Sequence, residues 1–356
     1  MSAYTDELTR AYTARLRLIL RGLPDFCDEF FRGIADDHGV RTRLVYAYDI
    51  KLFLEFLSAN VPKFARKPLF SYEMADLNSV TVDDVEEFME YLSYYVKEYE
   101  GRRGAEFEIS RQNAAVGKYR KLSALRTMYA YFMKKRKSDA NPAAVISAPK
   151  LKEKPIIQLE PEEVARLLDE VESGEKLTPA QKQYHEYTKY RDLAIITLLL
   201  GTGMRVSECV GIDIKHIDFA ATGVRVTRKG GGETVLYFGE EVADALMLYL
   251  PEREKTAALP GHGEALFLSL QKRRITARAV QNLVKKYAGL ISGLKKITPH
   301  KLRSTFATSL YRETGDIYLV ADILGHADVN TTRKHYARIH EDRRREAVKH
   351  VKLRSE

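Results

Sequence analysis

The sequence has 356 residues, of which 45% are hydrophobic and 30% charged, a composition typical of a globular chain and not of a disordered one. Its formal net charge of +9 favours an anionic partner, and nucleic acid is favoured over a membrane because the sequence has no long apolar run and no signal-like amino terminus. For the same reasons we expect a cytoplasmic protein. The two cysteines, Cys27 and Cys209, give no disulfide framework and no metal-ligand cluster, so we expect them to be small core residues.

The first half of the chain has the periodicity of helices. Apolar residues recur at spacings of three and four between Val45 and Phe56 and again between Val85 and Leu92, which is the pattern of helices with one buried face. We therefore predict an all-α amino-terminal domain over residues 1–148.

Charge is distributed unevenly within this half. Residues 109–137 carry nine basic residues and no acidic one, while the apolar positions among them keep a helical period. Such a helix can place its apolar side on a core and its basic side against phosphates. A solvated helix face is the alternative, and the absence of acidic residues argues against it. Residues 80–100 are acidic, and we expect them to face away from nucleic acid or toward a basic neighbour.

A change of character follows near residue 150. Residues 147–164 contain three prolines and no apolar periodicity before Ile156, which predicts a linker over residues 149–158. The second domain, residues 159–356, begins with a helix whose first turn is acidic and is expected to be mixed α+β and mainly helical. We predict an antiparallel hairpin over 223–238 around three glycines, a short strand over 265–270, and further helices at about 184–200, 240–250, 277–291, 300–312 and 317–324.

Several residues of the second domain are suited to chemistry on an anion. Arg205 lies near the end of an apolar helix and Glu208 lies one turn further on, so the carboxylate can hold the guanidinium. His300 and Arg303 stand three apart at the positive end of a helix that begins with Thr-Pro. Lys229 lies at the tip of the predicted hairpin. Taken singly, each has an ordinary alternative: an ion pair, a chance histidine–arginine spacing and a turn lysine.

The order of these residues resembles the catalytic set of the tyrosine recombinases of the integrase and Xer group. That set is arginine, lysine, histidine-x-x-arginine, histidine or tryptophan, and then tyrosine. This sequence fills all six positions: TGMRVSE supplies Arg205, TRKGG supplies Lys229, TPHKLRSTFAT supplies His300 and Arg303, LGHADVNTT supplies His326, and KHYA supplies Tyr336. The matches run from about residue 158 to residue 340, and the helical first half resembles the core-binding domain of that family.

Two details qualify this resemblance. Many relatives place the tyrosine nine residues after the histidine, whereas Tyr336 lies ten after His326. Tyr336 could singly be a residue of an amphipathic helix, but no other tyrosine follows Tyr318 in the sequence, so it is the nucleophile that the resemblance implies.

The chain length and the segments LPDFCDEFF and KYRDLAIITLLLGTGMRVSE look nearest to the single-recombinase Xer type of Gram-positive bacteria.

The set suits attack on a DNA phosphodiester. A phenol with a pKa of about 10 must lose its proton while negative charge grows on the non-bridging oxygens. Arg205 and Arg303 can donate paired, permanently charged hydrogen bonds to those oxygens, and His326 can add another donor. His300 is the candidate for accepting the tyrosine proton. The resemblance implies that Lys229 protonates the leaving 5′-hydroxyl.

A 3′-phosphotyrosyl bond would keep the energy of the broken phosphodiester, so no cofactor is expected. The sequence has no GxxxxGK[ST], HExxH or paired-carboxylate motif, and no metal is expected either. The resemblance implies that the two domains clamp duplex DNA, that four protomers hold two sites, and that a carboxyl-terminal helix passes to a neighbouring protomer. Residues 341–353 fit such a helix, with a solvated helical end as the equal alternative.

The function implied is site-specific DNA recombination, either to resolve chromosome dimers or to integrate and excise a mobile element. A type IB topoisomerase would use nearly the same chemistry, and a non-catalytic DNA-binding relative is disfavoured because all six catalytic positions are filled. Basic and polar residues on both domains are candidates for DNA contact: Arg111, Lys118, Arg120, Lys121, Arg278, Gln281 and Lys285.

Overall fold

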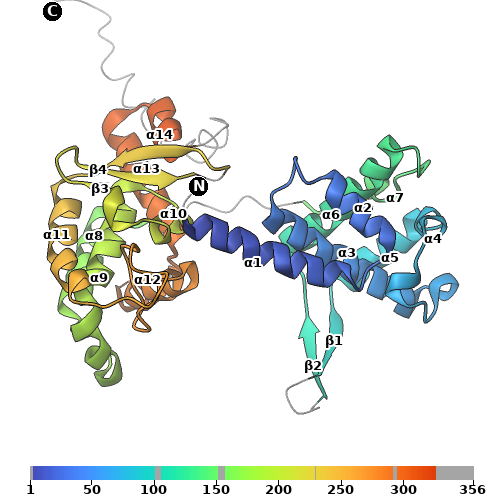
Figure 1. The fold of residues 1–356 in the computed structure, drawn as a ribbon, viewed down its shortest axis with the longest axis horizontal. Helices are drawn as coiled ribbons and strands as arrows, with labels where there is room; N and C mark the ends of the chain where they lie inside the picture. Colours follow the sequence, from blue (N-terminus) through green and yellow to red (C-terminus); the bar gives the residue numbers. More distant parts are fainter. Residues whose placement is uncertain (1–2, 101–105, 151–156, 229, 292–294, 326–356) are drawn as a thin grey trace, which may run out of the picture. The chain divides into compact units, whose positions relative to one another are not determined.

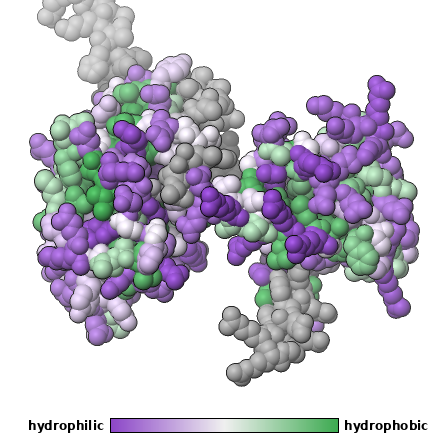
Figure 2. Space-filling view, viewed as in Figure 1, coloured by the Kyte–Doolittle hydropathy of each residue, from purple (hydrophilic) through white to green (hydrophobic). Residues whose placement is uncertain are grey.

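The computed structural model describes residues 3–100, 106–150, 157–228, 230–291 and 295–325 (Figure 1). It divides the chain into two compact units, one of residues 3–153 and one of residues 154–356 with the first two residues. Most of the predicted linker lies outside the described residues, and the boundaries predicted for the two domains stay a prediction. Figure 2 shows hydrophilic side chains over much of the visible face of each unit, with hydrophobic ones in smaller patches between them.

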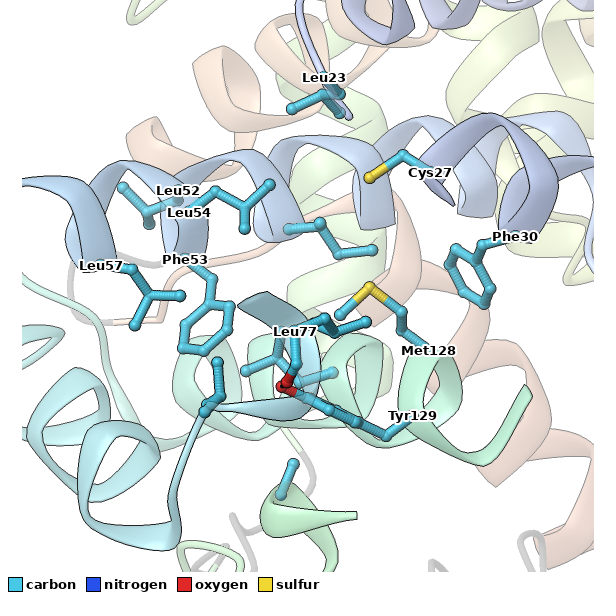
Figure 3. Close-up of a cluster of buried hydrophobic side chains, with 14 of the residues drawn as sticks. Leu23, Cys27, Phe30, Leu52, Phe53, Leu54, Leu57, Leu77, Met128 and Tyr129 are labelled. Atoms are coloured by element: carbon cyan, nitrogen blue, oxygen red, sulfur yellow. The ribbon is translucent and has the colours of Figure 1, made fainter. Parts of the chain in front are cut away.

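The first unit is a group of helices around a hydrophobic core. Its helices are α1 (Ala3–Leu20), α2 (Asp25–Gly33), α3 (Val40–Asn60), α4 (Met74–Asn78), α5 (Val82–Tyr91), α6 (Ala115–Lys134) and α7 (Pro142–Val145). The core lies between α3 and α6, where Phe53, Met128 and the thiol of Cys27 are fully buried (Figure 3). The hydroxyl of Tyr129 donates a hydrogen bond to the carbonyl oxygen of Leu77 at 3.0 Å, so the one polar atom of this buried ring has a partner.

A β-hairpin interrupts this helical unit and corrects the expectation that it is purely helical. Strands β1 (Tyr95–Glu100) and β2 (Glu106–Arg111) pair antiparallel. Helix α5 ends at Tyr91, and the backbone N–H of Asn113 donates to the carbonyl of Leu92 at 3.0 Å, which closes the base of the hairpin. The helical period of the acidic segment therefore stops near residue 92.

The basic helix α6 does not present all its charges to solvent. Lys121 is buried with 6% of its surface exposed and donates to Asn113 Oδ1 at 2.8 Å. Its Nζ lies 3.8 Å from a carboxylate oxygen of Asp49 on α3, and the guanidinium of Arg120 lies 2.8 Å from the other. Lys121 is thus part of a buried ion-pair group that joins α3 to α6, so we no longer count it among the DNA-contact candidates. Arg126 likewise donates to the carbonyls of Ala143 and Ile146.

The second unit is mixed and mainly helical, as predicted. Its helices are α8 (Pro161–Ser173), α9 (Pro179–Thr202), α10 (Val206–Val210), α11 (Glu240–Glu254), α12 (Ala277–Ile291), α13 (Pro299–Thr314) and α14 (Ile317–Leu324). Helix α9 is central to it, because residues 194–199 are almost completely buried and α8, α11 and α13 all pack on it. No helix among the described residues has the length and apolarity needed to span a bilayer.

The small sheet of this unit has the antiparallel order β3-β4-β5. Strands β4 (Gly223–Thr227) and β5 (Glu233–Tyr237) confirm the predicted hairpin, and the short strand β3 (Ile217–Asp218) adds an edge that was not predicted. The strand predicted over 265–270 is wrong, since that segment makes only two single bridges. The first four residues, Ala265 to Leu268, are buried, whereas Leu270 is exposed. A short buried apolar run has the same sequence pattern whether it pairs in a sheet or packs as an irregular segment.

The buried carboxyl group of Asp49 generates a testable pH dependence. Burial raises its pKa to about 6, although Arg120 and Lys121 oppose that rise. The group therefore favours folding below its unfolded pKa, and this contribution is lost as the pH rises through about 6. As the pH rises from 4 to 7, we expect the free energy of unfolding of Asp49→Asn to increase relative to that of the unchanged protein, by up to about 3 kcal/mol. Urea unfolding at several pH values measures this difference.

The matched control is Asp83→Asn on α5, where the aspartate is exposed. Its free energy of unfolding should stay parallel to that of the unchanged protein over the same pH range. A difference between Asp49→Asn and the unchanged protein that does not vary with pH would show that Asp49 titrates normally.

Candidate active site

The segment between α9 and α10 places Arg205 beside Glu208. Helix α9 ends at Thr202, and its C-cap residue Gly203 has φ +61°; a Cβ on this glycine would lie 2.3 Å from the ring of Phe306. Arg205 is the N-cap residue of α10, where its backbone N–H donates to Glu208 Oε2 at 2.7 Å and its Nη1 donates to Oε1 at 2.9 Å. The predicted pair is therefore present, with the carboxylate buried and 34% of the arginine side chain exposed.

Helix α13 carries His300 and Arg303 near its amino-terminal end. The helix begins at Pro299, where a missing N–H costs no helical hydrogen bond. His300 is exposed, whereas Arg303 is 5% exposed and points into the unit. Its Nη1 donates to the carbonyl of Gly203 at 2.7 Å and its Nη2 donates to the carbonyl of Leu324. Arg303 thus joins the turn before Arg205 to the end of α14.

The carboxyl-terminal turn of α14 brings the two predicted arginines together. Arg303 binds the carbonyl of Leu324, and Nη2 of Arg205 lies 3.4 Å from the carbonyl oxygen of Gly325, the next residue. Gly325 has φ +60° and follows the last residue of α14. The last carbonyls of a helix lack helical partners and lie at the negative end of its dipole, so they attract cations. Two guanidiniums from distant parts of the sequence therefore meet at one place.

A third arginine, Arg228, was missed by the sequence analysis. It follows the last residue of β4, and its guanidinium donates from Nη1 to the carbonyl of Leu324 at 3.1 Å and from Nη2 to that of Ile323 at 2.7 Å. Its Nη1 also lies 3.6 Å from Oε1 of Glu208. In the sequence Arg228 is simply the basic neighbour of Lys229, and no local pattern indicates its contact with α14.

The charges of this cluster suit a phosphoryl group. The cluster contains three guanidiniums, those of Arg205, Arg228 and Arg303, and one carboxylate, that of Glu208, which contacts Arg205 and Arg228. Its formal charge is therefore +2 (3 − 1). A phosphodiester under attack by a phenolate carries two negative charges, spread over its non-bridging oxygens. No group of acidic, histidine or cysteine side chains that could hold a metal ion occurs within the described ranges.

Three members of the predicted catalytic set lie outside the described residues: Lys229, His326 and Tyr336. The candidates for DNA contact divide by exposure. Arg278, Gln281 and Lys285 are exposed on one side of α12, whose other side is buried. In the first unit Arg111 and Arg120 are exposed, and Lys118 donates to the hydroxyl of Ser93 at 2.6 Å.

Known proteins resemble this chain in both sequence and fold. A model of the phage integrase family matches residues 158–343, just over half of the chain. The tyrosine recombinase XerC of Caldanaerobacter subterraneus is 33% identical over 312 residues, covering 85% of this chain and 79% of the relative. The XerC of Pelobacter propionicus is 30% identical over 295 residues, 83% of each chain.

Two solved structures share the fold. The integrase of the transposon Tn1549, solved with circular intermediate DNA, has a TM-score of 0.61 at 20% identity and covers 88% of this chain and 95% of that one. The XerH site-specific recombinase, solved with a palindromic difH substrate after cleavage, has a TM-score of 0.59 at 20% identity, covering 87% and 79%. The chain belongs to the phage integrase family and is a tyrosine site-specific recombinase.

Proposed function

We propose that the chain recombines DNA at specific sites with Tyr336 as nucleophile and with Arg205 and Arg303 as the groups that hold the scissile phosphate. The observation that carries this assignment is the meeting of the two guanidiniums at adjacent carbonyls, those of Leu324 and Gly325. Each guanidinium has five N–H donors in a planar fork, and carbonyl oxygens occupy the kind of position that phosphate oxygens would take.

The proposed reaction is a transesterification. The phenolic oxygen of Tyr336 bonds to phosphorus, its proton passes to His300, and the bond from phosphorus to the 5′-oxygen breaks. Lys229 gives a proton to that oxygen as it leaves, which produces a 3′-phosphotyrosyl strand and a 5′-hydroxyl strand. Attack by the 5′-hydroxyl of a partner strand reverses the steps and forms the recombinant bond. His326 donates a further hydrogen bond to the phosphate.

Glu208 supports this machinery through Arg205. Its buried carboxylate accepts from both the backbone and the guanidinium of Arg205, which fixes where the exposed part of that side chain points. A guanidinium that is already oriented loses little conformational freedom when the phosphate arrives.

The DNA partner and the assembly are proposed from the resemblance to the tyrosine recombinases. Duplex DNA is the partner, contacted in the second unit by Arg278, Gln281 and Lys285 on α12. Arg111, Lys118 and Arg120 contact it in the first unit. Four protomers hold two sites in the cytoplasm, and residues 341–353 pass from one protomer to the next. The biological role is chromosome dimer resolution or the movement of a mobile element, and the single-recombinase Xer type stays a prediction.

Recombination is tested with two copies of the DNA site that the protein binds, placed on molecules of different length. We expect strand-exchanged products of the combined lengths, without ATP. Products that are only relaxed, with no exchange between the marked molecules, would instead identify a type IB topoisomerase.

Replacing the proposed nucleophile gives a direct prediction. Tyr336→Phe should bind the site normally but form no covalent adduct on a nicked suicide substrate, because a phenyl ring has no oxygen to attack phosphorus. The control is Tyr318→Phe, since Tyr318 is an exposed tyrosine of α14. Its adduct yield should match that of the unchanged protein, and an adduct formed by Tyr336→Phe would refute the assignment.

The two-donor role of Arg303 predicts that charge alone is insufficient. Arg303→Lys keeps the positive charge but cannot span two acceptors, so cleavage of the suicide substrate should fall by about 100-fold or more, equivalent to about 3 kcal/mol of transition-state stabilisation. Arg312→Lys on the same helix, where the arginine pairs with Glu160 at the surface, is the control and should cleave normally. Thermal unfolding of both variants separates loss of catalysis from loss of folding, and near-normal cleavage by folded Arg303→Lys would contradict the role.

A further inference from the structure

We propose that Arg228 is a positioning residue that holds the turn bearing Lys229 against the end of α14, so that the ammonium group can protonate the leaving 5′-oxygen. This inference rests on the proposed function, which makes Lys229 the general acid. Arg228 itself contacts protein groups, and it acts through its neighbour.

The backbone of Arg228 closes the turn between β4 and β5. Its N–H donates to the carbonyl of Gly232 at 2.7 Å, and its carbonyl accepts from the N–H of Gly231 at 3.0 Å. Two of the glycines in this turn have positive φ, +105° for Gly230 and +92° for Gly231, and a Cβ on Gly230 would meet nothing within 4 Å. The glycines themselves contribute no side chain that could pack the turn against its surroundings. A flanking residue can supply such an anchor.

The side chain of Arg228 provides that anchor. Two of its donors bind the consecutive carbonyls of Ile323 and Leu324, and 16% of the side chain is exposed. These carbonyls are at the end of a helix, where they lack helical partners and where a cation is favoured. A planar guanidinium can bind two neighbouring oxygens at once, which an ammonium cannot reproduce with the same geometry.

The same guanidinium also lies close to the other arginines. A Cβ added to Gly325 would be 3.0 Å from Cζ of Arg228, so the guanidinium packs against the residue that precedes His326 in the sequence. Arg228 and Arg303 share the carbonyl of Leu324, and Arg228 and Arg205 share Oε1 of Glu208. Arg228 is therefore the residue among these that connects the turn of Lys229 to the phosphate-binding arginines.

The role of Arg228 can be separated from a merely structural one by changing the leaving group. A DNA strand with sulfur in place of the bridging 5′-oxygen leaves as a thiolate, whose conjugate acid has a pKa of only about 8.5, so it departs without a proton. We expect Arg228→Ala to cleave the ordinary suicide substrate at least about 10-fold more slowly than the unchanged protein. On the sulfur-bridged substrate its rate should return to within about threefold of the unchanged protein.

Three further variants make the outcome decisive. Lys229→Ala should be rescued by sulfur in the same way, Arg303→Ala should not be rescued because it loses phosphate stabilisation, and Arg225→Ala, an exposed arginine on the same strand, should cleave both substrates normally. If Lys229→Ala is not rescued, the general acid of the proposed function is wrong. If Lys229→Ala is rescued and Arg228→Ala is not, or if Arg228→Ala cleaves the ordinary substrate normally, the positioning role is wrong.

Should Arg228→Ala not fold, Arg228→Lys serves in its place. It keeps one charge near Glu208 but cannot bind both carbonyls, so the same slow cleavage and the same rescue are expected. Normal cleavage of the ordinary substrate by this variant would overturn the inference.

Discussion

The arrangement of the active site depends on the carbonyls at the end of α14, which have no hydrogen-bond partners within the helix. Three arginines reach these oxygens, from the α9–α10 turn, the β4–β5 turn and α13. Only α13 is next to α14 in the sequence. These oxygens offset part of the repulsion between the guanidiniums, and the carboxylate of Glu208 offsets a further part. Without acceptors at this point, three like charges would have to be brought together in a partly buried place at a cost that rises with desolvation.

Contacts within the second unit are enough to assemble this cluster. A site whose positive groups are already oriented does not need to reorganise when charge develops on phosphorus, and this is the main way in which proteins stabilise charged transition states. The arginines of this chain are oriented by backbone atoms and by one buried carboxylate, so their geometry follows from the folding of the second unit itself. Binding energy from DNA can then be used for alignment of the nucleophile and the leaving group.

The sequence predicts those parts of the molecule that depend on local spacing. The Arg205–Glu208 pair follows from three-residue spacing at a helix start, and the β4–β5 hairpin follows from alternation around three glycines. Helix α14 was placed correctly from its apolar residues. Arg228 could not be assigned, because its partners on α14 lie about a hundred residues further along the chain and nothing near it in sequence indicates them.

The prediction was wrong where it needed to know which way a side chain points or whether a segment pairs with another, because charge counts and apolar runs do not give this. A count of basic residues over 109–137 does not say which of them turn inward, and Lys121 is buried because Asp49 and Asn113 on neighbouring elements provide its partners. The apolar run over 265–270 marks burial without marking strand pairing, since Leu266 and Phe267 fill the core from an irregular segment. The β1–β2 hairpin was missed because the all-α prediction for residues 1–148 covered residues 95–111, although the helical period was found only up to Leu92.

The dependence on main-chain oxygens has a consequence for how this protein tolerates change. An acceptor that belongs to the backbone is present whichever amino acid occupies the position, so exchanges of exposed side chains on α14, such as those of Tyr318 and Leu319, leave the arginine anchorage intact. The vulnerability lies in helix geometry: a proline within α14, or a bulky residue in the left-handed conformation of Gly325, would displace all three guanidiniums at once.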